Sequence, residues 1–223
     1  MTVSFGLNKN AVIRSRPAIV VETDTWANPI VEKKRRAEPI KNPNDIKRIS
    51  EYLVANSRHR DNLLFVIGIN SSFRLRDLLQ LKWKHLLNDD GGTVSINASF
   101  ALKEEKTGRI REVFINQPVV DAICAYTERL RDIDLDAYVF RAERKDRVPN
   151  TPLSVRRAGL MLTEVINGQL GIGVRASTHC LRKTFGYQVA MNTNDKAGAI
   201  NLLREILGHS SEATTLLYIG LAG

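Results

Sequence analysis

A histidine and an arginine three residues apart carry the strongest chemical signal in this chain, within the segment Thr178–Phe185. If Thr178 caps a helix, His179 and Arg182 lie on one face of its first turn. Free backbone N–H groups and the positive end of the helix dipole make that position attractive to a phosphate group. A guanidinium there could bind two phosphate oxygens at once, which an ammonium cannot. Taken alone, such a pair is usually structural or incidental, so it needs further support.

A second histidine lies in the segment Leu207–Ser211. Gly208 can end one helix in the left-handed conformation, and the serines that follow can begin the next. His209 would then be held at a helix junction, and Tyr218 stands nine residues later on a short final helix. A lone tyrosine in such a place is normally a packing residue. Its spacing from His209 gains weight only in company with the other candidates.

Two further cations lie earlier in the chain. Arg74 precedes a leucine-rich segment, and Asp77, three residues later, is placed to orient the Arg74 guanidinium. Lys106 belongs to the segment Lys106–Arg109, which we expect at the tip of a hairpin. Either cation alone is most often an ordinary solvated charge. They become candidates for phosphate chemistry only together with the histidine, arginine and tyrosine motifs.

In combination these motifs resemble the catalytic domain of the tyrosine recombinases, the phage-integrase-like enzymes. Their pattern is an arginine before a short acidic and leucine-rich helix, a lysine in a β-hairpin, His–x–x–Arg, Leu–Gly–His, and a tyrosine shortly afterwards. The order and approximate spacing hold here across residues 42–223. Each motif alone is common, but chance agreement at all of them is improbable. The resemblance implies an α+β, mainly α-helical fold with a small antiparallel three-stranded sheet.

The resemblance also implies how a phosphate of double-stranded DNA would be bound and attacked. Arg74 and Arg182 would clamp the scissile phosphate, and His209 would donate a further hydrogen bond to it. Tyr218 would attack phosphorus to give a 3′-phosphotyrosine and a free 5′-hydroxyl. A covalent phosphodiester conserves bond energy, so strands could be rejoined without ATP. The implied enzyme is a site-specific recombinase or integrase that acts as a homo-oligomer, a tetramer, on DNA.

Proton transfer is assigned by the same resemblance. Lys106 would protonate the leaving 5′ oxygen, and His179 would assist proton transfer at the tyrosine. Lys103 competes with Lys106 for the acid role, although the Lys–Thr–Gly context favours Lys106. The phenol of Tyr218 has a reference pKa of about 10, so it needs a base or nearby cations to become a nucleophile.

Two other functions remain open from the sequence. A type IB topoisomerase shares the chemistry but relaxes supercoils without exchanging partners, and a non-catalytic DNA-binding regulator could retain the fold. The complete set of motifs argues against the regulator, and the Leu–Gly–His pattern favours the recombinase. About 40 residues precede the catalytic region, too few for the helical core-binding domain that full-length relatives carry.

The chain is strongly basic, with a formal net charge of +9 and a pI of about 9.8. Such a surplus favours a polyanionic partner, because phosphate neutralisation releases counterions. Residues 1–41 lack sustained periodicity and are expected to form an extended basic arm beside a catalytic domain at 42–223. The arm is either a phosphate contact, a solvated leader or a docking segment for a protein. Candidate DNA contacts are Lys33, Lys34, Arg35, Arg36, Lys103, Arg109 and Lys183.

Hydrophobic spacing predicts the elements that must position these residues. Asn42 can cap a helix that begins at Pro43. Alternation over Val94–Phe100 and Ile110–Ile115 predicts antiparallel strands, with a turn at Thr107–Gly108. Further helices are expected at 62–70, 75–83, 119–130, 154–167, 178–191, 196–207 and 211–219.

Several classes of protein are disfavoured. The sequence has no apolar run long enough to span a membrane and no visible secretory signal. Its cysteines, Cys124 and Cys180, do not suggest a disulfide framework, so reduced thiols in the cytoplasm of a prokaryotic cell or mobile-element host are the simplest interpretation. Neither a His–Glu–x–x–His motif nor a paired Cys–x–x–Cys motif occurs, so we expect no metal and no cofactor.

Overall fold

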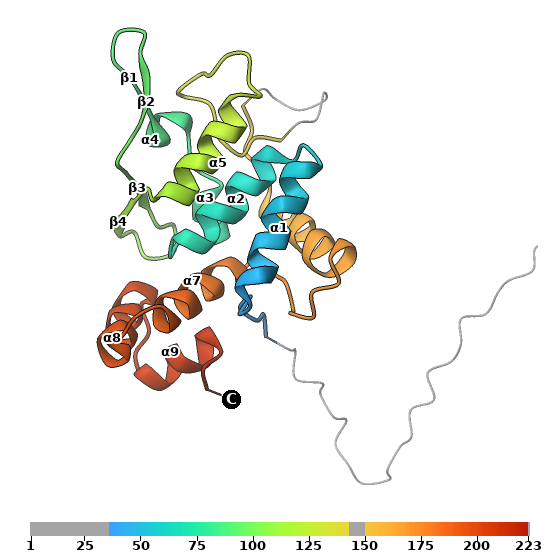
Figure 1. Cartoon of the computed structure of the whole chain (residues 1–223). Coiled ribbons are helices and arrows are strands. Elements are labelled where there is room, and N and C mark those ends of the chain that lie inside the picture. The colour runs from blue at the N-terminus through green and yellow to red at the C-terminus, as the bar shows by residue number, and fades with distance from the viewer. Residues whose placement is uncertain (1–35, 143–149, 223) are drawn as a thin grey trace, which may run out of the picture. The chain divides into compact units, whose positions relative to one another are not determined.

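The computed structural model describes residues 36–142 and 150–222 (Figure 1). Its larger core is built around α2, which is apolar on most sides and packs against α1, α5 and α7. The start of α1 matches the prediction, because the Asn42 side chain accepts a hydrogen bond from the Asn44 backbone at 2.9 Å. The longer helices around this core are α1 (Pro43–Ala55), α2 (His59–Asn70), α5 (Gln117–Thr127) and α6 (Val155–Thr163), which η1 (Glu164–Gln169) continues as a π-helix.

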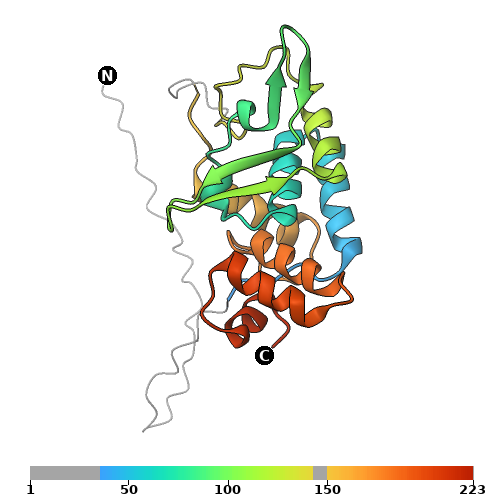
Figure 2. The ribbon, with the colours of Figure 1, turned by 90° about the vertical axis from the view of Figure 1, so that its left-hand side faces the viewer.

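The mainly helical α+β class is confirmed, but the sheet differs from the one expected. In the described residues the strands form two separate antiparallel pairs, and Figure 2 shows the β3–β4 pair crossing in front of the helices. Between the two pairs, the Asn97 side chain donates to the backbone carbonyls of Lys84 and His85. The pairs are β1 (Leu87–Asp89) with β2 (Val94–Ile96), and β3 (Ser99–Lys103) with β4 (Ile110–Phe114).

The helix expected at 75–83 is shorter than predicted. It is a single turn, α3 (Leu75–Leu78), and the chain becomes extended before the next turn, α4 (Trp83–Leu86). Lys82 forms an isolated β-bridge with Tyr138, and the carbonyl of Leu81 accepts from the Val139 backbone at 2.9 Å. This tertiary pairing outweighs the helical propensity of the leucine-rich sequence.

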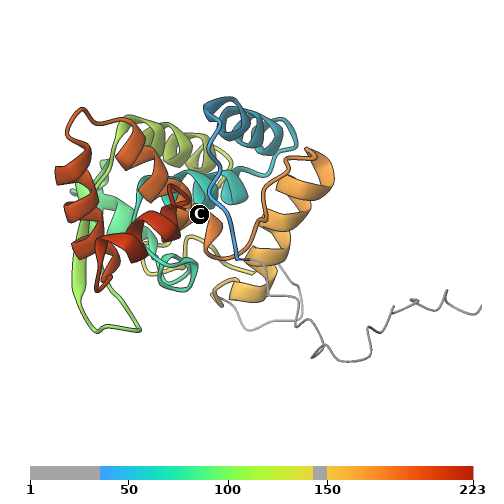
Figure 3. The ribbon, with the colours of Figure 1, turned by 90° about the horizontal axis from the view of Figure 1, so that it is seen from below.

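The last three helices have a small hydrophobic core of their own, formed by residues such as Leu203, Leu207 and Ile219. They are α7 (Cys180–Met191), α8 (Lys196–Leu207) and α9 (Glu212–Ile219). Figure 3 shows α8 and α9 on one side and α6 with η1 on the other. Gly186 of α7 permits the close approach of α9, because a Cβ there would lie 2.6 Å from Cγ2 of Ile219. The packing of α9 against α7 therefore depends on this glycine.

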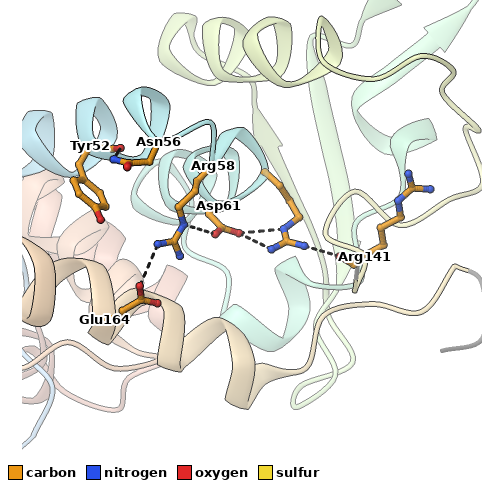
Figure 4. Close-up of polar contacts among 7 residues, drawn as sticks. Tyr52, Asn56, Arg58, Asp61, Arg141 and Glu164 are labelled. Carbon is orange, nitrogen blue, oxygen red and sulfur yellow. Dashed lines mark hydrogen bonds and ion pairs between the residues drawn. The ribbon is translucent and has the colours of Figure 1, made fainter. Parts of the chain in front are cut away.

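A polar network joins α2 to more distant parts of the chain (Figure 4). Asp61 is 5% exposed and accepts hydrogen bonds from Arg58 Nε at 3.0 Å and Arg60 Nη2 at 2.9 Å. Arg60 also donates to the carbonyl of Arg141, and Arg58 lies 3.5 Å from Glu164 in η1. Because a buried carboxylate is stable only when paired, this network fixes the start of α2.

The segment before α1 runs along the folded domain from residue 36 onward. Ile40 is fully buried, and its backbone N–H donates to Thr184 Oγ1 of α7 at 2.9 Å. The ammonium of Lys41 donates to the carbonyl of Gly220, just beyond α9, at 2.8 Å. The rest of the predicted arm, including Lys33, Lys34 and Arg35, lies outside the described residues, so the division at residue 41 stays a prediction.

Within residues 36–142 and 150–222, no helix is long and apolar enough to cross a membrane. No group of three or more histidine, cysteine, aspartate and glutamate side chains in these ranges could hold a metal ion. Cys124 and Cys180 are both free thiols.

Candidate active site

An acidic residue directly after β3 lies among three arginines. Glu104 is 1% exposed, and its carboxylate oxygens lie 3.5 Å from Arg74 Nη1, 3.5 Å from Arg111 Nη2 and 4.0 Å from Arg182 Nη1. The arginines come from the residue before α3, from β4 and from the first turn of α7. Burial raises the pKa of Glu104, but the Thr107 hydroxyl and the three guanidiniums together hold it below its usual value. This cluster brings the two predicted arginines together.

Two of these arginines also hold the end of α8. Arg182 is 3% exposed and donates from Nη2 to the carbonyl of Leu207 at 3.2 Å. Arg111 donates from Nη1 to the carbonyl of Ile206. The last carbonyls of a helix have no partner within the helix and carry partial negative charge, so cationic donors stabilise them. The histidine that follows α8 is thereby attached to the arginine cluster.

The start of α7 differs from the predicted cap. Thr178 was expected to cap the helix, but the described contact is made by Ser177, whose Oγ accepts from the His179 backbone at 3.3 Å. His179 itself occupies the N-cap position, with φ −96° and ψ −10°. The prediction for Thr178 is therefore wrong, and the histidine lies one position before the first turn rather than within it.

His179 lines a cavity of about 380 Å³ together with Arg74 and Lys106. Desolvation lowers the pKa of His179, and the charge of Arg182, with smaller effects from cations that include Lys106, lowers it further. A lowered pKa favours the neutral imidazole, which can accept a proton. The cavity thus combines a proton acceptor with three cations, Arg74, Arg76 and Lys106.

His209 is held at the junction between α8 and α9, as the sequence predicts. Gly208 adopts the left-handed conformation with φ 70°, and Ser211 caps α9 by accepting from the Thr214 backbone at 3.2 Å. The Nδ1 atom of His209 lies 3.1 Å from Thr215 Oγ1, and Thr215 is fully buried. This contact fixes the imidazole ring.

Tyr218 is half-buried beside two of the predicted residues. Its ring meets the His209 ring edge to face, with centroids 4.9 Å apart, and Nζ of Lys183 lies 4.8 Å from the Tyr218 centroid. Burial raises the pKa of Tyr218, while the charges of Arg182 and Arg74 lower it. Burial and the same two arginines lower the pKa of His209. The phenol therefore lies within electrostatic reach of both predicted phosphate-binding arginines.

The predicted turn at 107–108 is confirmed, with Gly108 at φ 68° and its N–H donating to the carbonyl of Glu104 at 2.8 Å. Lys106 is exposed on this turn and faces the cavity that contains His179. Lys103 is also exposed, but successive strand residues point to opposite faces, so it points away from the face that buries Leu102 and Glu104.

Asp77 was predicted to orient Arg74, and the structure gives it a different contact. Its Oδ1 atom accepts from the Glu105 backbone at 3.0 Å, and the residue is 4% exposed. The carboxylate paired with Arg74 is that of Glu104. Asp77 therefore joins α3 to the hairpin beside the cavity, and sequence reasoning missed Glu104 altogether.

The predicted DNA contacts have varied surroundings. Arg36 and Arg109 are exposed, whereas Lys183 is only 7% exposed and lies over the Tyr218 ring. Arg36 and Lys183 line a cavity of about 310 Å³ with Tyr218. Contact of these three cations with DNA stays a prediction.

Residues 42–222 match the phage integrase family. The chain belongs to this family. It is 33% identical over 186 residues to the probable integrase/recombinase YoeC of Bacillus subtilis, an alignment that covers 82% of this chain and 90% of that protein. It is 26% identical over 174 residues to the tyrosine recombinase XerA of Pyrococcus furiosus, covering 78% of this chain and 54% of that protein. The chain spans about half the length of its XerA and XerC relatives.

Solved structures confirm the fold of this phage integrase family member. A crystal structure of XerA recombinase aligns with a TM-score of 0.60 and 24% identity, over 83% of this chain and 61% of that one. A post-cleavage complex of the XerH site-specific recombinase with its difH substrate aligns with a TM-score of 0.57 and 20% identity, over 79% and 48%. At these identities the likeness concerns the fold.

Proposed function

We propose that this chain is a site-specific recombinase or integrase that cleaves and rejoins strands of duplex DNA through a covalent intermediate at Tyr218. The observation that carries the proposal is the convergence of a phenol with two buried or half-buried arginines and a fixed histidine. Arg182 and Arg74 act electrostatically on Tyr218, whose ring contacts that of His209. The names of the YoeC, XerA and XerC relatives support recombination as the outcome.

In the proposed reaction the Tyr218 oxygen attacks the scissile phosphorus. The new bond is a 3′-phosphotyrosyl ester, and the bond from phosphorus to the 5′ oxygen breaks. The phenolic proton passes to neutral His179, and Lys106 donates a proton to the leaving 5′ oxygen. Rejoining reverses each transfer: a 5′-hydroxyl attacks the phosphotyrosine, and the phenol is released. Atoms and charge balance without ATP.

The cations would act where charge develops. Negative charge on the non-bridging oxygens grows in the transition state, and fixed donors stabilise it because they need no reorganisation. Arg182 is held by the end of α8, and Arg74 by its pairing with Glu104. Arginine suits this role, since its planar fork can bind two phosphate oxygens. Lys106 is favoured over Lys103 as the acid because it lines the cavity shared with His179.

Partners and location follow as further parts of the proposal. Related structures contain DNA, including XerH with difH and a λ integrase dimer with a COC′ core site. We propose double-stranded DNA as the partner of this chain and a homotetramer as the assembly that exchanges strands. A cytoplasmic location is proposed from the free thiols of Cys124 and Cys180.

The decisive experiment is covalent trapping on a nicked duplex, whose cleaved end diffuses away and leaves the protein attached. The wild-type chain should form an adduct that resists denaturant. Tyr218→Phe should bind DNA with unchanged affinity and form none. Tyr187→Phe is the matched control, because this tyrosine lies on α7 rather than α9 and its ring contacts Nζ of Lys41, 5.5 Å from the centroid. An adduct that survives Tyr218→Phe, or that maps to Tyr187, contradicts the proposal. Products from a two-site substrate separate recombination from simple relaxation.

A further inference from the structure

The carboxylate of Glu104 holds two guanidiniums without satisfying their hydrogen bonds. Its distances to Arg74 and Arg182, 3.5 and 4.0 Å, exceed the roughly 2.7–2.9 Å of a charge-assisted hydrogen bond. Nη1 of each arginine and Oε1 of Glu104 are buried without a hydrogen-bond partner among the described residues. The arginines are therefore held by charge, and the buried Nη1 group of each is the one that faces Glu104.

Glu104 also closes the turn that carries Lys106. The Thr107 hydroxyl donates to Glu104 Oε2 at 2.6 Å, and the Glu104 backbone N–H donates to the carbonyl of Arg109 at 2.9 Å. The carbonyl of Glu104 accepts from Gly108, as described above. One residue thus connects the hairpin turn, through both its backbone and its side chain, to the arginine cluster.

We infer that Glu104 is a positioning residue that sets the phosphate-binding arginines and the Lys106 turn in one arrangement before DNA binds. This inference rests on the proposed function. Glu104 touches neither the phosphate nor the nucleophile in this scheme, and it acts through Arg74, Arg182 and Thr107.

The negative charge, rather than the shape of the side chain, is the essential property. Three guanidiniums converge on this point, and like charges at such distances repel strongly where water is excluded. A glutamine at position 104 could still accept from Thr107, but it would not offset the repulsion. Arg74 and Arg182 would then move apart, and a misplacement of about 1 Å in a reacting site can slow a reaction by about 100-fold.

The test compares single-turnover covalent-complex formation by Glu104→Gln, Glu104→Asp and Glu51→Gln with that of the wild-type chain. The glutamine keeps the size of the side chain and removes its charge, whereas the aspartate keeps the charge. Glu51 is the matched control, since this carboxylate of α1 pairs with Lys47 at 3.7 Å, is 63% exposed and does not line the cavity that contains Lys106 and His179. DNA affinity and melting temperature are measured for every variant.

We expect Glu104→Gln to cleave about 100-fold more slowly, with DNA affinity equal to or tighter than that of the wild type. Glu104→Asp should regain at least about a tenth of the wild-type rate, and Glu51→Gln should be unaffected. The acidic limb of the pH–rate profile of Glu104→Gln should also move to lower pH. The reason is that the charges of Arg74 and Arg182, which lower the pKa of Tyr218, are no longer opposed.

If Glu104 only stabilised the fold, its substitution would not shift the acidic limb of the pH–rate profile. The other charged or titratable groups that face the phenol are unchanged in every variant; they are Arg36, His179, Lys183 and His209. Cleavage by Glu104→Gln at the wild-type rate overturns the inference. So does a slow Glu104→Gln whose pH limb is unmoved and whose rate Glu104→Asp does not improve. Absence of an adduct with the wild-type chain would instead refute the proposed function.

Discussion

The hydrogen bond between His209 and Thr215 predicts an unusual effect of a buried threonine on catalysis. Thr215 Oγ1 donates to the carbonyl of Ser211 at 3.3 Å, so its lone pair is left to accept from Nδ1–H of His209 at 3.1 Å. With the proton on Nδ1, the neutral ring has only a lone pair on Nε2. A lone pair cannot donate to a phosphate oxygen, so the proposed contact requires the imidazolium form of His209.

Thr215→Val removes the acceptor and keeps the shape of the side chain. A hydrogen bond to a charged group contributes about 1.5–3 kcal/mol. At about 1.4 kcal/mol for each factor of ten, its loss should slow cleavage by about 10- to 100-fold at acidic pH. The fold should lose only about 1 kcal/mol, because the Thr215 backbone N–H still donates to Ser211. DNA affinity should be nearly unchanged.

The effect should depend on pH with a definite sign. Burial and the charges of Arg182 and Arg74 lower the pKa of His209 before DNA binds, so deprotonation is favoured as pH rises. In the variant the neutral ring is free to carry its proton on Nε2 and to donate without being charged. The rate deficit of Thr215→Val relative to the wild type should therefore shrink as pH rises.

The assay is single-turnover formation of the covalent complex on a nicked duplex between about pH 6 and 9. Thr214→Val is the matched control, since Thr214 is exposed and its hydroxyl contacts Ser211 rather than His209. A constant deficit across this range would refute the tautomer argument. A Thr215→Val enzyme as fast as the wild type at every pH would refute the role of the hydrogen bond itself.

Three further changes test the proton donor, the packing of α9 and the polar network of α2. Lys106→Ala should slow cleavage by about two to four orders of magnitude. A 5′-bridging sulfur substrate, whose leaving group needs no proton, should restore most of the rate. If the sulfur substrate rescues Lys103→Ala instead, Lys103 rather than Lys106 is the general acid. Gly186→Ala places a Cβ against Ile219. The overpacking should destabilise the contact between α7 and α9, which carries Tyr218, by about 1–3 kcal/mol. The cleavage rate should therefore fall while DNA affinity is retained, and an equal loss of both would contradict this. Asp61→Ala removes the buried acceptor that Arg58 and Arg60 share. It should lower the free energy of unfolding by about 1.5–3 kcal/mol in urea titrations; an unchanged midpoint would show that the network is dispensable.

Sequence reasoning succeeded where the determinants are local. Asn42 and Pro43 begin α1, and Gly208 ends α8, because capping and left-handed conformations depend on a few adjacent residues. It failed where a tertiary contact outweighs local preference. The β-bridge from Lys82 to Tyr138 ends the helix expected at 75–83, and no pattern within that segment indicates its partner.

The convergence of the catalytic candidates came from the resemblance and not from spacing. Arg74 and Arg182 are more than a hundred positions apart in the sequence, and no periodicity links a residue before α3 to one in α7. The structure brings them together because α3 follows α2, which packs against α7, and because Gly68 permits that packing: a Cβ there would lie 2.5 Å from Cδ1 of Leu181.

Glu104 was missed although the sequence contains its signal. Phe100 and Leu102 are buried on one face of β3, and the period of two places Glu104 next on that face. A carboxylate on the apolar face of a strand is costly unless cations pair with it. Its neighbours at 103 and 105 point outward. Within the charged run Lys103–Lys106, these neighbours are solvated, whereas Glu104 is the buried counter-charge of the arginines. Strand period applied to the charged residues, as well as to the apolar ones, would have singled out this carboxylate and shown that buried cations must surround it.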